Sequence, residues 1–552
     1  MEKFEQFIAL LETYVWSFPA NITDGNVLPL IVIIILGFGI FITLRLGFVQ
    51  IVQFKHAFRV LTGRYDNPDD LGDINHFQAL STALSATVGV GNIAGVALAI
   101  HIGGPGALFW MWVTALFGMA TKFTECTLGA HYRVKNEDGT VSGGPMYYIE
   151  RGLGPKWKWL AVLFAIAASI CALLTGNAIQ ANTLADVMNS KFQLPFWVTG
   201  LVSAALVGAV ILGGIKRIGY VTARLVPLMA IMYVFAGLVI LLLNYDQIIP
   251  SFVIIFTNAF NPQAGALGVG SGALILTLAY GVQRGLFSNE AGQGSSPIAM
   301  AASKTDEPVQ AGLVGLLGPF IDTIIVCSIT GLVIISTGAW DSYHQGPVMP
   351  AGPNISYTVD AASADPNILV FENGMPVNGQ MLRFNIPVDT MFVDANFSIP
   401  FNGMIDVSQR QAVAFNEAGE LVGRLFGGVV ENVASLTSVA FSKGLSPIFP
   451  YGELIVTLAV FFFVISTSIS WSYYGERSIH YLLGKKSVVP YRMLFVFAHF
   501  LGALGSVTVV WSFGDVMLGI MAFVNITGLI LLSPVIYQLS KKYVDKMKNE
   551  TD

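Results

Sequence analysis

Long uninterrupted apolar stretches limit most strongly what this chain can fold into. A helix needs about 20 apolar residues to cross roughly 30 Å of hydrocarbon, and the sequence contains about eleven such stretches. Only 11% of its residues are charged and its mean hydropathy is +0.66, whereas a typical soluble domain has about 25% charged residues. A soluble core would bury one or two such stretches, not eleven. The sequence therefore predicts an all-α polytopic membrane protein.

The candidate spans have high hydropathy and reach or exceed the length of a membrane crossing. They are 28–48, 78–100, 105–130, 158–188, 195–213, 218–243, 263–302, 309–337, 451–475, 491–512 and 515–539. We expect six units: an extra N-terminal helix with a cytoplasmic linker, a first five-helix repeat, the start of a second inverted repeat, an extracytoplasmic insertion with an external loop, the rest of the second repeat, and a cytoplasmic tail. Their expected bounds are 1–77, 78–244, 245–337, 338–450, 451–540 and 541–552.

The distribution of Lys and Arg among the loops predicts the orientation. With the N-terminus outside, 20 of the 29 Lys and Arg residues fall in inside loops, six fall outside and three lie within spans. A miscounted span would invert every later loop and remove this asymmetry. We therefore expect a multi-pass protein of a bacterial inner (plasma) membrane, with its C-terminus in the cytoplasm. No basic patch interleaved with aromatic residues suggests a nucleic-acid partner.

Two spans are interrupted at mid-membrane depth by glycines mixed with polar residues. The first contains Ser85–Gly95 (SATVGVGNIAG) and the second Gly285–Pro297 (GLFSNEAGQGSSP). Polar groups at this depth are costly unless they line a site. The two interruptions are five spans apart, and an odd number of spans per half makes the halves run in opposite directions. Paired broken helices in inverted repeats indicate the binding site of a secondary transporter.

A broken helix offers unpaired amides on one side and unpaired carbonyls on the other. The amide end suits a carboxylate and the carbonyl end suits a cation. In the first break we expect exposed amides at Val90 and Gly91, and exposed carbonyls around Ser85 and Val88. Glycine at 89 and 91 removes the Cβ atoms that would keep a ligand away from the backbone.

A hard cation such as sodium takes about six oxygen ligands, so the carbonyls of a break need partners from another helix. The span 451–475 supplies Ser466, Thr467 and further hydroxyls in the run STSIS. The alternative is that these hydroxyls bond back to their own helix. Gln180, which also lies within a span, either links helices or binds the ammonium group of a substrate.

Four of the titratable residues within spans bear on the mechanism. Lys122 precedes Glu125 by one helical turn, which favours an internal ion pair. Glu290, the only acid in a break, and Asp322 leave a proton-coupled carrier open as a rival. A membrane amino-acid sensor is a further rival from another class. No span carries a His-rich metal set, a nucleophile–base pair or paired carboxylates, so we do not expect an enzyme.

Five motifs together resemble the alanine or glycine:cation (sodium) symporter family, within the wider set of transporters with LeuT-type inverted repeats. They are Thr87–Gly95, Gly103–Gly118 (GGPGALFWMWVTALFG), Gly143–Tyr148, Gly176–Asn182 and Arg284–Gly292. The resemblance covers about 28–337 and 450–540. It implies a LeuT-type 5+5 inverted repeat with one extra N-terminal helix, importing glycine or alanine together with sodium by alternating access.

The resemblance also implies a set of binding residues. The substrate is expected against the first break, two further helices and the eighth core helix, at Thr87, Gly89, Val90, Gly91, Gln180, Phe287, Asn289 and Trp471. Sodium (Na+), a co-transported ion, is expected between carbonyls and hydroxyls at Ser85, Val88, Ser466 and Thr467. Two aromatic residues over a glycine-lined floor favour a small amino acid.

The stretch from Gly338 to about Pro450 departs from the resemblance, because family members have only a short loop there. Asn-Gly pairs punctuate alternating runs in its first part, which indicates strands and hairpins. We expect a small β-rich module as far as about Val413. The remainder, Ala414–Lys443, favours a helical external loop.

Overall fold

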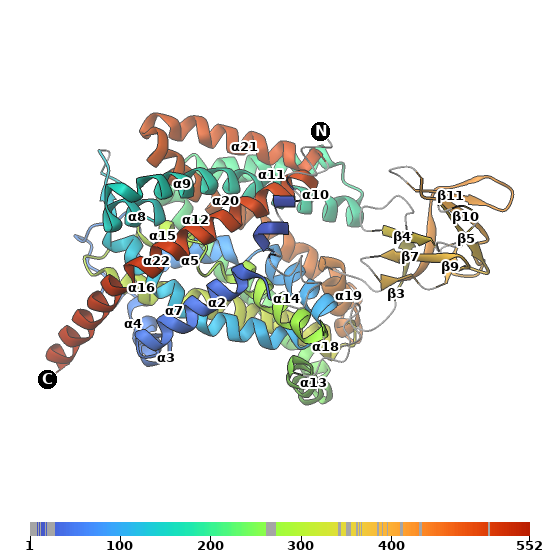
Figure 1. Ribbon diagram of the computed structural model, residues 1–552, viewed down its shortest axis with the longest axis horizontal. Coiled ribbons are helices and arrows are strands. Elements are labelled where there is room, and N and C mark those ends of the chain that lie inside the picture. Colours follow the sequence, from blue (N-terminus) through green and yellow to red (C-terminus); the bar gives the residue numbers. More distant parts are fainter. Residues whose placement is uncertain are drawn as a thin grey trace.

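The computed structural model describes residues 28–137, 139–260, 272–340, 433–505 and 508–551. It also describes 8, 10–11, 13–16 and 18 and, with gaps, 344–429. A body of packed helices carries a β-rich region at one end, and the C-terminal helix extends from the opposite end (Figure 1).

The helices of the first half follow the expected spans closely. They are α2 (Leu30–Arg45), α3 (Val49–Val52), α4 (Phe54–Leu61), α5 (His76–Thr87), η2 (Gly91–Gly95), α6 (Val96–Gly103), α7 (Ala107–His131), α8 (Pro145–Leu153), η3 (Pro155–Trp157), α9 (Lys158–Leu173), η4 (Leu174–Ala178), α10 (Ile179–Phe192), α11 (Phe196–Ile211) and α12 (Gly214–Leu243). Two of them, η2 and η4, are π-helical turns. Such turns occur often at functional sites.

The short helices α3, α4 and α8 lie between the expected spans, and the second half adds a further helix that the hydropathy pattern does not predict, α13 (Ile248–Phe260). The remaining helices are α14 (Gly272–Asn289), α15 (Ser296–Met300), α16 (Pro308–Gly315), α17 (Leu317–Pro319), η6 (Phe320–Cys327), α18 (Ser328–Ser336), α19 (Val433–Leu445), α20 (Gly452–Leu483), α21 (Val488–Leu504) and α22 (Thr508–Thr551). Residues 263–271 of the expected span 263–302 lie outside the described residues.

Among the described residues, six continuous helical segments are long and apolar enough to cross a membrane, and a seventh is a bent pair. Two shorter apolar helices, α2 and α11, match the expected spans 28–48 and 195–213. Helix α7 matches 105–130, and α14 and α15 belong to 263–302. A mostly helical polytopic fold is therefore confirmed, whereas the count of eleven spans and the inverted repeat stay predictions.

Both interruptions predicted from the glycine clusters are present, but they are shorter than the clusters. Helix α5 begins with a capping box at Asn75 and ends at Thr87, and the chain bends by 54° before it continues through η2. The second glycine cluster begins inside a helix, because α14 continues to Asn289. Gly285 therefore lies within a helix, where a Cβ atom would be 3.1 Å from the side chain of Thr114. The second break spans only 290–295.

The β-rich region has its own small core and is built from short antiparallel strands. They are β3 (His344–Val348), β4 (Ile355–Val359), β5 (Ile368–Glu372), β6 (Met375–Pro376), β7 (Gly379–Arg383), β8 (Ile386–Pro387), β9 (Met391–Phe392), β10 (Gly403–Asp406), β11 (Val413–Asn416), β12 (Leu421–Val422) and β13 (Leu425–Val429). The expected hairpin turn at Asn373–Gly374 is confirmed, with φ of 51° and 80°. The expectation of helix from Ala414 onward is wrong as far as Val429, because the strands pair on to that point and helix begins only at Val433.

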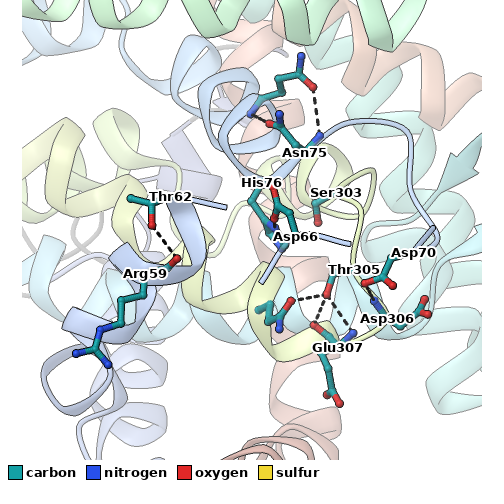
Figure 2. A network of polar contacts seen from close by, with 12 residues as sticks. Arg59, Thr62, Asp66, Asp70, Asn75, His76, Ser303, Thr305, Asp306 and Glu307 are labelled. Atoms are coloured by element: carbon teal, nitrogen blue, oxygen red, sulfur yellow. Dashed lines mark hydrogen bonds and ion pairs between the residues drawn. The ribbon is translucent and has the colours of Figure 1, made fainter. Parts of the chain in front are cut away.

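At the end of the body opposite the β-rich region, two loops that lead into and out of the broken helices pair with each other. Main-chain bonds join Asp73, Ile74 and Lys304 to the facing strand of chain, as in the 2.8 Å bond from the Lys304 amide to the Ile74 carbonyl. Asp70 and His76 belong to the surrounding polar network, in which His76 contacts Asp66 at 2.6 Å (Figure 2).

Arg133 joins these two loops through side-chain hydrogen bonds. Its guanidinium donates to the carbonyls of Leu71, Ala301 and Ser303 at 2.9, 3.0 and 2.7 Å, and also to that of Thr305. We call residues 66–76 and 301–307, with Arg133, the loop junction. It ties together the chain that enters α5 and the chain that leaves α15.

Candidate functional site

A cavity of about 640 Å³ lies where the two breaks approach each other. Its size falls within the range of small-molecule sites. Its wall is formed by the first break, the π turn η4 with α10, the C-terminal part of α14, and parts of α20 and α22. The predicted binding residues that line it are Thr87, Gly89, Val90, Gly91, Gln180, Phe287, Thr467 and Trp471.

Asn289 is the one expected substrate residue that the structure does not bring to this cavity. Its Nδ2 donates to Thr323 Oγ1 at 3.2 Å, and its Oδ1 accepts from the Ala291 amide at 3.0 Å. The side chain thus caps the end of α14 and packs toward η6. Asn289 is the last residue of α14, directly before the second break, and its side chain does not point as the motif predicts.

The expected sodium residues form a direct contact between two helices. Thr467 Oγ1 on α20 donates to the Ser85 carbonyl on α5 at 3.2 Å, and Ser85 Oγ donates to the Ser466 carbonyl at 2.7 Å. A Cβ atom on Gly89 would be 2.8 Å from Thr467 Oγ1. Val88 is fully buried at the end of α5. Oxygen atoms of α5 and α20 therefore converge beside the cavity.

Ser466 also agrees with the alternative of bonding within its own helix, because its Oγ donates to the Phe463 carbonyl at 3.0 Å. The Thr467 hydroxyl, in contrast, bonds across to another helix. Of the two hydroxyls, Thr467 therefore carries the stronger evidence for a role beyond local helix packing.

A buried polar cluster joins the two breaks, and most of it was not predicted. Asn92 Oδ1 accepts from the Gly89 amide at 2.8 Å, while Asn92 Nδ2 donates to Asp322 Oδ1 at 2.6 Å. Ser288 on α14 donates to the other carboxylate oxygen at 2.5 Å. Sequence reasoning singled out Asp322 as a membrane-embedded acid, but no pattern linked it to Asn92. The shape of the first break depends on this contact.

Glu290 lies in the second break with a left-handed backbone, at φ 56°. A non-glycine residue in this region is strained by about 1–3 kcal/mol and is found mostly at functional sites. The residue is 4% exposed, lines the cavity and accepts a hydrogen bond from Ser295. The ion pair expected within α7 is confirmed, because Lys122 Nζ lies 3.4 Å from Glu125 Oε1.

The N-terminal segment contributes a residue that sequence reasoning missed. Trp16 is 5% exposed and its ring centroid is 4.7 Å from that of Phe287, a lining residue of the cavity. Its indole N–H donates to the Asp515 carbonyl on α22 at 2.9 Å. Trp16 belongs to none of the spans or motifs that the sequence predicts. Trp16 thus packs against the lining residue Phe287 from outside the cavity and restricts the position of its ring.

Broken apolar helices around a buried, partly polar cavity are the architecture of a membrane carrier. Comparison with known proteins identifies the class and then the family. The sequence profile of the sodium:alanine symporter family matches residues 9–359 and 423–552. The chain belongs to the sodium:alanine symporter family, and it is a multi-pass membrane transporter and not an enzyme.

Two relatives match nearly the whole chain. The sodium/alanine symporter AgcS of Methanococcus maripaludis is 40% identical over 550 residues, covering 99% of each chain. The amino-acid carrier protein AlsT of Bacillus subtilis is 30% identical over 533 residues, covering 96% of this chain and 93% of that one. The family profile leaves 360–422 unmatched, and most of the β-rich region falls in that gap.

Among solved structures, a manganese transporter mutant of Eremococcus coleocola is similar over 85% of this chain and 82% of that chain. The TM-score is 0.42 and the sequence identity is 11%. This similarity is too low to support an argument about the arrangement of the helices, which is described from the contacts within this chain alone.

Proposed function

We propose that this protein imports a small neutral amino acid, alanine or glycine, together with sodium by alternating access within a LeuT-type inverted repeat. The contact of Thr467 with the Ser85 carbonyl, directly beside the cavity, carries the proposal. In this scheme the carbonyls of Ser85 and Val88 and the hydroxyls of Ser466 and Thr467 hold sodium. The relative AgcS bears the name sodium/alanine symporter, which supports the same cargo.

Sodium binding at this position links ion and substrate through shared structure. The carbonyl of Ser85 belongs to the end of α5, and the next residues of the chain, Thr87 and Gly89, line the cavity. An ion that fixes the end of α5 therefore also fixes the backbone that receives the amino acid, and the coupling is reciprocal.

The direction of access follows from the cavity wall. The lining residues include Asp186 near the end of α10 and Ser435 in α19. Both helices approach the β-rich end of the body (Figure 1), and the described lining residues include none of the loop junction. Because the Lys and Arg asymmetry assigns the β-rich end to the outside, the cavity faces outward in this arrangement.

The basic test is uptake of labelled L-alanine by the purified protein in liposomes. We expect accumulation when an inward sodium gradient is imposed, and none when potassium replaces sodium. Uptake that is equally fast without sodium would disprove the coupling. Binding of alanine without accumulation under any gradient would instead indicate a sensor.

Replacing Thr467 by alanine is expected to weaken sodium dependence. The variant removes the hydroxyl that reaches Ser85, so we expect the sodium concentration for half-maximal uptake to rise about tenfold, equivalent to about 1.4 kcal/mol. Ser472→Ala is the matched control, since the Ser472 hydroxyl donates to the Ile469 carbonyl of its own helix. Equal sodium dependence in the two variants would contradict the assignment.

Replacing Trp16 by alanine is expected to weaken substrate binding while sodium dependence stays unchanged. The substitution removes the ring that supports Phe287, and such an aromatic pair contributes about 0.5–1.5 kcal/mol. We therefore expect KM for alanine to rise about two- to tenfold. Trp159→Ala is the control, because Trp159 is 62% exposed on the surface of α9. A KM that equals that of the control would show that the N-terminal segment does not shape the cavity.

Proton coupling is the second candidate, and the position of Glu290 in the cavity wall favours it. Uptake driven by a pH gradient in the absence of sodium, and abolished in Glu290→Gln, would select this mechanism.

A further inference from the structure

Two glutamine side chains in the cavity wall each have an oxygen atom that receives no hydrogen bond from any residue the structure describes. They are Gln180 on α10 and Gln293 in the second break, and in each the unpaired buried atom is Oε1. Gln293 is only 1% exposed. A buried carbonyl without a donor is unfavourable, so two of them in residues that line one cavity are explained by a ligand that donates hydrogen bonds.

The orientation of both amides is fixed by their other ends. Gln293 Nε2 donates to the Leu286 carbonyl at 3.0 Å, and Gln180 Nε2 donates to the Thr175 carbonyl at 3.2 Å. A main-chain carbonyl can only accept, so flipping either amide would place oxygen against oxygen. The groups left without a partner among the described residues are therefore the two carbonyl oxygens.

A third acceptor of the same wall is the carboxyl group of Glu290. The main-chain N–H of Gln293 donates to the main-chain carbonyl of Glu290 at 3.2 Å, so both residues belong to one turn of the second break. The indole of Trp471 lies beside the Glu290 carboxyl group. Trp471 also packs against Gly176, in the π turn that precedes Gln180. The indole thus contacts both the turn that carries Glu290 and Gln293 and the turn that leads to Gln180.

Three acceptor groups, one of them a carboxyl, match the three N–H donors and the positive charge of a primary ammonium group. We propose that Gln293, Glu290 and Gln180 form the subsite that binds the ammonium group of the transported amino acid. This inference rests on the proposed function, and it adds Gln293 and Glu290 to the binding residues. It makes a primary ammonium group the feature by which the carrier recognises its cargo.

Each methyl group added to that nitrogen removes one donor, and a hydroxyl in its place removes the charge and two donors. N-methyl-L-alanine should therefore inhibit alanine uptake more weakly than alanine itself, and L-lactate more weakly still. The loss of one charge-assisted hydrogen bond lowers affinity about tenfold or more.

The decisive variant is Gln293→Met, which keeps the length of the side chain and removes its oxygen. Inhibition constants for unlabelled L-alanine and for N-methyl-L-alanine are measured against labelled alanine uptake in proteoliposomes. We expect the inhibition constant for alanine to rise about tenfold and that for N-methyl-L-alanine to rise much less. The ratio of the N-methyl-L-alanine constant to the alanine constant should therefore fall. A merely structural role of Gln293 would raise both constants equally.

Gln50→Met is the matched control. Gln50 is also buried, its Nε2 donates to Thr43 Oγ1 at 3.0 Å and its Oε1 lacks a donor, but it does not line the cavity. We expect both inhibition constants to stay at their wild-type values in this variant. A ratio that is the same in Gln293→Met as in the wild type would overturn the subsite.

A second readout separates the ammonium group from sodium as the ligand of these oxygens. Sodium chloride alone should raise the unfolding temperature of the wild type and of Gln293→Met equally, with choline chloride as the reference. If sodium stabilised only the wild type, the oxygens would belong to an ion site and the inference would fail. If the wild type accumulated no alanine but was stabilised by L-glutamine in a Gln293-dependent way, the proposed cargo would fail and the subsite would stand.

Discussion

Gly176→Ala is expected to abolish uptake, lowering the rate about a hundredfold or more. A Cβ atom at this position would be 2.3 Å from Trp471 Cγ and 2.4 Å from Trp471 Cβ. Neither atom is the flexible end of a side chain, so the π turn η4 or helix α20 must shift. Both carry cavity residues, Thr175 in η4 and Thr467 on α20. A displacement of about 1 Å at a site of this kind costs about a hundredfold in rate.

The double variant Gly176→Ala, Trp471→Ala distinguishes this collision from a general folding defect. Removing the indole opens the space that the new methyl group needs, so we expect the unfolding temperature to recover toward the wild-type value while uptake stays absent. Gly37→Ala is the control for a glycine within a span, because a Cβ atom there has nothing within 4 Å. Loss of uptake in Gly37→Ala of the same size would show that the effect is not specific to Trp471.

Arg133→Ala is expected to destabilise the protein by about 3 kcal/mol, since each lost hydrogen bond to a charged group contributes about 1.5–3 kcal/mol and the losses overlap. The variant leaves the carbonyls of Leu71, Ala301, Ser303 and Thr305 without their shared donor. We also expect the loop junction to open, because this one guanidinium joins the chain on both sides of it. Thermal unfolding in detergent measures the first effect.

Cysteine accessibility measures the second effect of Arg133→Ala. A cysteine placed at Ser303, which is fully buried in the junction, should react with a membrane-impermeant maleimide much faster in the variant than in the Arg133 background. Arg133→Lys retains the charge but not the planar fork, so we expect only partial recovery. The exposed Arg151 supplies the control substitution Arg151→Ala. Equal reactivity in all backgrounds would contradict the role of Arg133.

The sequence predicted the fold best where a single physical requirement dominates. Crossing a membrane demands length and hydropathy, and the expected spans 158–188, 309–337 and 451–475 correspond to long apolar helical segments. Helix α13 was missed because its 13 residues are too few for that criterion. Strand β13 was missed because it pairs with the distant strand β3, which local patterns do not encode. Strands β11 and β12 pair locally, with β10 and with each other, and this hairpin was not recognised in the sequence.

For the candidate site, too, the sequence predicted some features and missed others. The glycine-rich motifs indicated which residues lie near the breaks, because polar groups and glycines at membrane depth are costly unless the helix opens there to form a site. They did not indicate side-chain directions, so Asn289 was expected in a cavity that it does not line. Gln293 was overlooked among the glycines and serines around it. Its significance depends on the Leu286 carbonyl occupying its other end, which is a matter of tertiary structure.

The β-rich region begins and ends at one place. Its first strand, β3, pairs antiparallel with its last, β13, so that His344 faces Val429 and Val348 faces Leu425. A segment whose ends meet can be gained, lost or exchanged by recombination without moving the flanking helices. For the experimenter, the same geometry marks the position where a rigid fusion protein can replace the region as a fiducial for electron cryo-microscopy of this small membrane protein.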